Sequence, residues 1–247
     1  MAEKILFVFE GEKTEHVISR DFIHYFINDE EKTIVKVSFC AEIYQLYRKI
    51  KEDDFGMDYI DIFPLLQERD HSLKSYKRDE FSQVYLFFDY DPHATNASNT
   101  DLHEMLDVFS EETDKGKLFI SYPMVESIRC FNGIDDDFNN LLIPKSDVGG
   151  FKKLVNEYAD KKYNNVPQWT RDTWVKIIEI HCKKANNIVF GVNELPKSDI
   201  GQCLILDKQC EIEEVSNSVI VISSFPLMFL SHFGENMEDI LAERSSC

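Results

Sequence analysis

The sequence predicts an α/β fold with a mostly parallel sheet. Strand-like segments alternate with segments of helical periodicity through the N-terminal half of the chain. Two of the strand-like segments, KILFVF at 4–9 and QVYLFF at 83–88, are almost entirely apolar, as in strands buried on both faces. After about residue 145 the pattern becomes helical. We therefore expect an α/β core over residues 1–145 and a helical extension over 146–247 that packs on it.

The core is expected to contain four strands connected by helical segments. The strands are predicted over 4–9, 33–39, 83–88 and 117–122. The helical segments are predicted over 15–29, with Thr14 as its N-cap, over 41–52, 58–70 and 101–114, and after Pro123. Right-handed crossovers bring the C-terminal ends of such strands to one edge of the sheet, which is where open α/β sheets have their sites.

The extension is expected to be helical, with a single short strand. Helices are predicted over 147–163, 168–190, 199–215, 224–233 and 237–244, and a strand over 218–222. The sequence has neither an internal repeat nor a linker long enough to separate domains.

Composition excludes several classes of protein. The sequence has no run of 18 apolar residues, so we expect no membrane helix. Its N-terminus reads as a strand rather than as a secretion leader, and its six cysteines form no C-x-x-C pair. We therefore expect a cytoplasmic protein with reduced thiols and no zinc site. The 45 acidic and 27 basic residues give a net charge of −18, which argues against unaided nucleic-acid binding. A metal, a local basic patch or a partner would have to supply the attraction.

Carboxylates follow several of the predicted strands. Glu10 ends the first strand, and Asp89 and Asp91 follow the third, where the two-residue period of a strand points them to the same side. Glu126 lies just beyond the fourth strand, on the expected first turn of a helix. Oxygen ligands of this kind suit Mg²⁺ or Mn²⁺. The pattern therefore predicts metal-dependent chemistry on phosphodiesters, with metal ions at the attacking and leaving oxygens.

Two motifs in this half of the chain resemble a known domain. A strand followed by E-G-x-x-T-E (FVFEGEKTE) and a later strand followed by D-x-D (YLFFDYD) are similar to the Toprim domain of topoisomerases, primases and several nucleases. The first motif is most similar to Toprim nucleases of phage defence: the OLD family, RloB-like proteins, and the effectors of PARIS and AbiL-type systems. The segment SYPMVESIRCF resembles the one that follows the D-x-D strand in these effectors. The resemblance covers about residues 4–132.

The resemblance implies roles for the carboxylates. Glu10 would be a metal ligand or a general acid/base, and Asp89 and Asp91 would be metal ligands. Glu15 matches the second glutamate of the motif as a further ligand. Many OLD-type motifs are one residue shorter, which leaves Glu12 as a rival to Glu15.

Further residues are implied less directly. Glu126 matches the catalytic glutamate that follows a proline. OLD-type nucleases also use a downstream lysine near the scissile phosphate, for which Lys145, Lys152 and Lys153 are candidates that the spacing does not separate.

The resemblance predicts a Mg²⁺- or Mn²⁺-dependent endonuclease that acts as the toxic effector of an abortive-infection defence against phage. Its substrate would be DNA or RNA, with tRNA included. Such effectors work with an ABC- or SMC-like ATPase. This chain has no G-x-x-x-x-G-K-[ST] motif, so the ATPase would be a separate protein. A homodimer is left open.

Two other interpretations remain at this point. The chain could be a non-catalytic interaction subunit on a Toprim scaffold. It could also be a phosphatase of the haloacid-dehalogenase type with Asp89 as nucleophile, although His93 stands where that motif has Thr or Val. Four aromatic residues among basic ones could stack on bases, but a helix core explains them better: Tyr158, Tyr163, Trp169 and Trp174.

Overall fold

A computed structural model describes residues 3–27, 32–39, 43–52, 61–92 and 98–243. It confirms the α/β class and the mostly parallel sheet. The five strands of this sheet lie in the order β2-β1-β3-β5-β4. Their bounds are β1 Glu3–Phe9, β2 Lys32–Ser38, β3 Phe81–Asp89, β4 Ser110–Glu111 and β5 Gly116–Ser121. β1 pairs in parallel with β2 and with β3, whereas the short strand β4 runs antiparallel to β5.

The central strands are buried on both faces, as the apolar runs predict. Every residue of β1 from Ile5 to Phe9 has an exposed fraction of 0%. The parallel register places Phe7 beside Tyr85 and Phe9 beside Phe87. The rings of these four residues contact one another with centroids 5.3–6.1 Å apart, mostly edge to face. This aromatic layer fixes the two central strands against each other.

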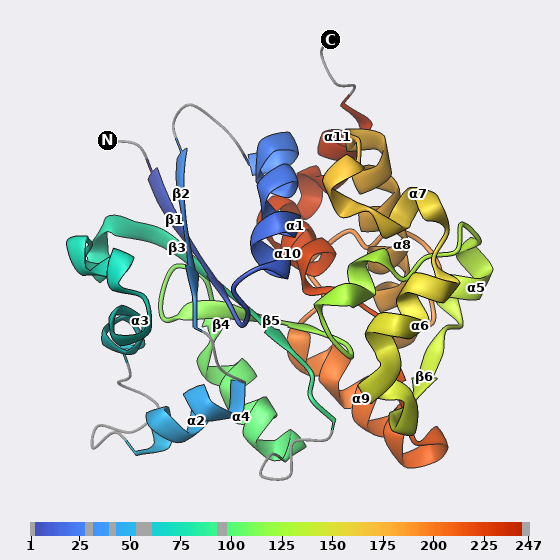
Figure 1. Cartoon of the computed structure of the whole chain (residues 1–247), viewed down its shortest axis with the longest axis horizontal. Helices are drawn as coiled ribbons and strands as arrows, with labels where there is room; N and C mark the ends of the chain where they lie inside the picture. Colours follow the sequence, from blue (N-terminus) through green and yellow to red (C-terminus); the bar gives the residue numbers. More distant parts are fainter. Residues whose placement is uncertain (1–2, 28–31, 40–42, 53–60, 93–97, 244–247) are drawn as a thin grey trace. The chain divides into compact units, whose positions relative to one another are not determined.

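Helices cover both faces of these strands. The helices that connect the strands are α1 Thr14–Phe22, α2 Ile43–Lys51, α3 Phe63–Arg69 and α4 Asn99–Val108. Figure 1 shows α1 on one side of the strands and α2, α3 and α4 on the other. α2 and α4 contact each other, and the Tyr47 hydroxyl donates a hydrogen bond to Glu104 over 2.8 Å.

The chain divides into two compact units. The first contains Met1–Asp89 and His93–Phe119, and the second contains Tyr90–Pro92 and Ile120–Cys247. The chain therefore passes between the units three times. The predicted boundary at residue 145 separates an α/β core from a helical extension by type of secondary structure, not by compactness, and it stays a prediction.

The second unit is largely helical. Its helices include α5 Asp135–Asn139, α6 Phe151–Tyr158, α7 Lys161–Asn164, α8 Arg171–Phe190, α9 Gln202–Ser216, α10 Ser224–Phe233 and α11 Met237–Ala242. Strands β6 (Leu142–Pro144) and β7 (Ser218–Ile220) pair antiparallel in a small separate sheet. None of the helices that the structure describes combines the length and the apolar character needed to cross a membrane.

Several predicted elements differ in the structure. The first helix ends at Phe22 and continues as a π-helix over Ile23–Ile27. The predicted helix after Pro123 is wrong, because the chain forms a 3₁₀ helix over Val125–Arg129. The predicted helix over 147–163 is instead a 3₁₀ turn followed by the two helices α6 and α7.

Candidate functional site

Glu10 and Asp89 lie side by side at the C-terminal edge of the sheet. Glu10 follows the last residue of β1, and Asp89 is the last residue of β3, the neighbouring strand. The backbone N–H of Glu10 donates to the carbonyl oxygen of Phe87 over 3.0 Å. The backbone N–H of Asp89 donates to Glu10 Oε2 over 2.9 Å. Both residues are half-buried. The structure thus brings together the two carboxylates that the sequence placed at neighbouring strand ends.

The pair lies where the sheet topology reverses. From β1 the chain leaves through α1, on one side of the sheet, to β2 at one edge. From β3 it leaves through α4, on the other side, towards β5. Crossovers that depart to opposite sides open a crevice outside the carboxyl ends of the two strands, and ligands of open α/β sheets bind there. Glu10 and Asp89 occupy the rim of this topological switch point.

Glu15 is fixed against the turn that follows Glu10. Its side chain is buried, with 6% exposed, and its Oε1 accepts the Gly11 N–H over 3.0 Å. The predicted cap at Thr14 is wrong: α1 begins at Thr14 itself, and Lys13, in the cap position, makes no capping bond. Glu12, the rival of Glu15, is exposed. Of the two, Glu15 is the one built into the turn.

His16 ties α1 to the end of β2. Its Nε2 lies 2.8 Å from the Ser38 hydroxyl, and its ring contacts Phe9 with centroids 5.0 Å apart. Burial, together with Lys36, lowers the pKa of His16, so the imidazole is neutral at pH 7. This contact holds the helix beside the strand end that carries Glu10.

Asp91 belongs to the second unit, where Tyr90 anchors its segment. Asp91 itself is half-buried. The Tyr90 N–H donates to the Ser121 carbonyl over 2.9 Å, and the Tyr90 hydroxyl donates to Glu213 Oε2 over 2.8 Å. The other oxygen of Glu213 forms an ion pair with Lys145. Burial raises the pKa of Glu213, but the hydrogen bonds from Lys145 and Tyr90 outweigh it and leave the pKa below its ordinary value.

Glu126 lies in the first turn of the 3₁₀ helix Val125–Arg129 in the second unit. Only 5% of the residue is exposed. Its Oε1 forms an ion pair with Lys152 Nζ over 3.1 Å. Its Oε2 is buried and has no hydrogen-bond partner within the part of the chain that the structure describes. A buried carboxylate oxygen without a donor is costly, so a donor or a cation is expected to reach it in the working protein.

The three candidate lysines have different surroundings. Lys145 is paired with Glu213, and Lys152 is paired with Glu126. Lys153 forms an exposed pair with Glu157 one helical turn away, and its side chain is 83% exposed. Lys153 therefore differs from the other two lysines. Lys152 contacts Glu126, a predicted site residue, and Lys145 contacts Glu213, which accepts a hydrogen bond from Tyr90.

The sequence analysis missed Glu213 and Arg129. Glu213 is 123 residues away from Tyr90 along the chain, in a helix that carries several other acidic residues. Arg129 ends the same 3₁₀ helix as Glu126, and its Nη1 donates to Asn156 Oδ1 over 2.7 Å and to Asn164 Oδ1. No spacing in the sequence marks either residue, because both act through folding contacts between distant segments.

The donors at the strand ends fit a hard cation. Across the described ranges, no group of three or more His, Cys, Asp or Glu side chains is arranged to hold a metal ion. Mg²⁺, however, usually takes only one or two carboxylates and completes its shell with water and substrate phosphate. Glu10 and Asp89 supply two carboxylates on adjacent strands, so the residues present fit such an ion.

Other predicted features are placed in the core. Tyr163, Trp169 and Trp174 are buried, which confirms the helix-core interpretation and leaves them unable to stack on bases. Cys130 and Cys182 are buried free thiols, and Cys203 and Cys210 are half-buried. His93, Cys40 and Cys247 lie outside the described residues.

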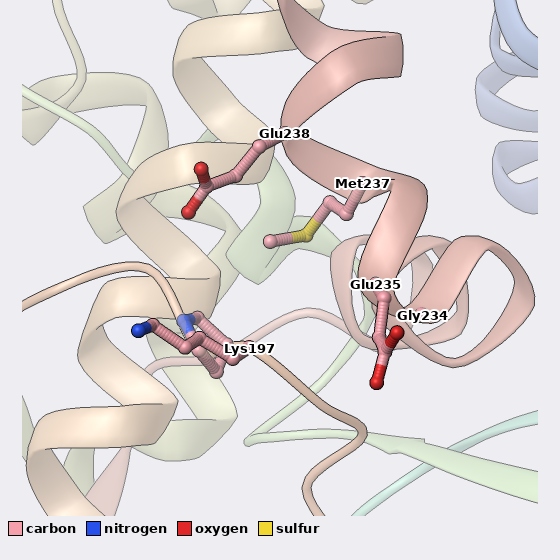
Figure 2. A pocket seen from close by; sticks show the side chains of 6 residues that line it. Lys197, Gly234, Glu235, Met237 and Glu238 are labelled. Carbon is pink, nitrogen blue, oxygen red and sulfur yellow. The ribbon is translucent and has the colours of Figure 1, made fainter.

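The second unit has a surface pocket that is lined by none of the predicted site residues. It has a volume of ≈ 300 Å³ and is lined by Pro196, Lys197, Gly234, Glu235, Met237 and Glu238. Figure 2 shows the charged side chains at this pocket. Its mixed charge and its mixture of polar and apolar side chains indicate no particular ligand.

Comparison with known proteins identified no relative of this chain. Neither a protein-family model, nor a curated protein, nor a solved structure matches it. The candidate site therefore rests on the residues and contacts described above.

Proposed function

We propose that the chain is a Mg²⁺-dependent endonuclease of the Toprim type. The observation that supports this most is the adjacency of Glu10 and Asp89 at the switch point of a mostly parallel sheet. These residues are the first carboxylates of the two motifs that resemble the Toprim nucleases. The proposal extends to a role as the toxic effector of an anti-phage, abortive-infection system, with DNA or RNA as substrate.

Glu10 and Asp89 are the residues that would hold the ion. Bound Mg²⁺ would supply charge stabilisation at the attacking and leaving oxygens of a phosphodiester. The hydrogen bond from the Asp89 N–H orients the Glu10 carboxylate before any ion binds, which reduces the reorganisation needed on binding. Asp91 and Glu15 are proposed as further metal ligands, and Glu126 as a catalytic residue.

Because of the negative net charge of the chain, the proposal includes a partner protein. At −18, the chain repels a polyanion beyond the immediate reach of a bound metal. We therefore expect low activity from the chain alone and propose that a separate ATPase subunit positions or releases it.

The test combines metal binding with cleavage. Thermal unfolding is measured for the wild type and Asp89→Asn with and without Mg²⁺ or Mn²⁺, and nicking of DNA and RNA is assayed in parallel. Asp79→Asn is the matched control, because Asp79 is an exposed carboxylate just before the other end of β3. A native-state metal site raises the midpoint by mass action, and Asp89→Asn should abolish that rise while Asp79→Asn preserves it.

Two results would count against the proposal. If millimolar metal shifts no midpoint and the wild type cleaves neither nucleic acid, with or without its ATPase, the nuclease assignment fails. If small phosphate esters are hydrolysed and Asp89 is trapped as an aspartyl-phosphate, the chain is a phosphatase instead.

A further inference from the structure

A second group of charged side chains surrounds Glu126. Arg129 lies three residues after it in the same 3₁₀ helix, and Lys152 reaches it from α6. Arg129 is held in place by two amides, Asn156 on α6 and Asn164 at the end of α7. The ammonium of Lys152 thus contacts the buried carboxylate of Glu126, and the guanidinium of Arg129, three residues further in the same 3₁₀ helix, is held by α6, the helix that carries Lys152, and by α7.

The guanidinium has unused donors. All the hydrogen bonds that the Arg129 side chain makes within the described segments come from Nη1, which leaves Nε and Nη2 without an acceptor there. Its acceptors are neutral amides, and among the described residues no carboxylate accepts a hydrogen bond from it. A half-buried guanidinium is stabilised by an anion with two oxygens that accept parallel N–H bonds, as two non-bridging oxygens of a phosphate do.

The local charge also differs from that of the whole chain. Residues 148–162 contain four lysines and two acidic residues, in a chain whose net charge is −18. The side chain of Lys152 is 69% exposed although Glu126 holds it, so its remaining N–H donors can reach a ligand at the surface. A local excess of basic residues is one of the three means by which so acidic a chain could attract a polyanion.

We propose that Arg129 and Lys152 form a phosphate subsite beside Glu126 that takes a backbone phosphate of a polynucleotide. The inference rests on the proposed function for its substrate class. The Arg129 fork would bind two non-bridging oxygens and Lys152 would neutralise the same phosphate. The subsite contacts no base, so it binds DNA and RNA of any sequence.

The experiment measures binding without cleavage. Short fluorescent single-stranded DNA and RNA of one sequence are titrated with protein in EDTA over a series of salt concentrations. The variants are Arg129→Gln, Arg129→Lys and Lys152→Gln. Lys153→Gln is the control, since Lys153 is the adjacent lysine of α6 and pairs with Glu157 instead.

Each lost phosphate contact should weaken binding several-fold and reduce the slope of log K against log salt by about 0.7. Arg129→Gln and Lys152→Gln should show both effects, and Lys153→Gln neither. Arg129→Lys should keep the slope but lose affinity, because the charge remains and the fork does not. The exposed position of Lys152 makes its variant informative even if Arg129→Gln unfolds the protein.

Failure of the subsite can be distinguished from failure of the nuclease proposal. Wild type that binds neither oligonucleotide, or variants that bind with the affinity and slope of the wild type, overturn the subsite. Binding that depends on Arg129 and Lys152 in a protein that never cleaves in Mg²⁺ keeps the subsite and overturns the nuclease. If inorganic phosphate alone binds and the oligonucleotides do not, the polynucleotide assignment is wrong.

Discussion

Gly11 and Glu15 approach each other so closely that a Cβ at the first position would displace the Glu15 carboxylate. The Gly11 N–H donates to Glu15 Oε1 over 3.0 Å, and a Cβ on Gly11 would lie 2.9 Å from Glu15 Oε2. Real Cβ atoms almost never come that close to another heavy atom. The glycine of the E-G-x-x-T-E motif is therefore explained by the space that a buried carboxylate needs.

Gly11→Ala should displace the Glu15 carboxylate and lower the free energy of unfolding by about 0.5–1.5 kcal/mol, the usual contribution of the one hydrogen bond that is lost. Chemical denaturation measures it, with Gly149→Ala as the control, because a Cβ at Gly149 meets nothing within 4 Å. In a Glu15→Ala background the cost of Gly11→Ala should fall. Equal effects of the two alanine substitutions in the wild-type background would contradict the close approach.

Glu213 should make the protein more sensitive to acid. Its folded-state pKa lies below its ordinary value of about 4.3, so its contribution to stability is complete above that value and is lost as pH falls through the folded pKa. Glu213→Gln should therefore flatten the decline in unfolding free energy below about pH 5. At pH 7 it should cost about 1–2 kcal/mol, since Lys145 and the Tyr90 hydroxyl lose a charged acceptor. Parallel pH profiles for the wild type and the variant would disprove the role assigned to this carboxylate.

Lys184 should produce a rise in stability at alkaline pH. The side chain is fully buried in α8 and donates to the carbonyl oxygens of Phe138 and Leu141 over 2.8 and 2.7 Å. Burial lowers its pKa to about 7. Between pH 7 and about 8.5, below the range in which the thiols of the unfolded chain titrate, the unfolded chain binds a proton at Lys184 that the folded protein does not, so stability increases with pH.

Lys184→Met keeps most of the buried volume and removes the titrating group. It should abolish the alkaline rise, which urea denaturation at a series of pH values measures. Lys183→Met is the control, because Lys183 is the neighbouring residue of the same helix and is less buried. A wild-type profile parallel to that of Lys184→Met from pH 7 to 10 would show that Lys184 stays protonated in the folded state.

The buried thiols should resist modification. Burial raises the pKa of Cys130 to about 12 and raises that of Cys182 as well, and both side chains have exposed fractions of 0%. Iodoacetamide at pH 8 should therefore leave both unmodified in the native protein and alkylate both in urea, as peptide mass spectrometry would show. Rapid native labelling of Cys130 would mean that its surroundings open on the timescale of the reaction.

The parallel core was predicted well from the sequence, because a strand that is buried on both faces is a continuous run of apolar residues. The runs that became β1 and β3 are apolar without alternation, and Glu10 and Asp89 mark where burial ends. Elements whose type the pattern of apolar residues does not determine were predicted less well. The helical spacing of Val125 and Ile128 fits a 3₁₀ helix as readily as an α-helix.

The candidate site was predictable only in part, for a related reason. Carboxylates at strand ends can be found from the strands alone. Strand β6 was missed because three residues are too few to show a period. Glu213 and Arg129 were missed because their partners lie tens of residues away along the chain, and local patterns contain no record of such contacts.

The three passages of the chain between the two units have a consequence for making and studying the protein in pieces. No single cut yields both units intact, because Tyr90–Pro92 interrupts the first and belongs with residues beyond Phe119. Glu213 follows Tyr90 by 123 residues, so during synthesis the Tyr90 hydroxyl still lacks this acceptor when the last residue of the first unit, Phe119, has been added. An N-terminal fragment that ends before Glu213 would lack the acceptor of the Tyr90 hydroxyl. A loss of function on deletion of a C-terminal segment could therefore come from the altered Tyr90–Pro92 segment and not from the residues removed.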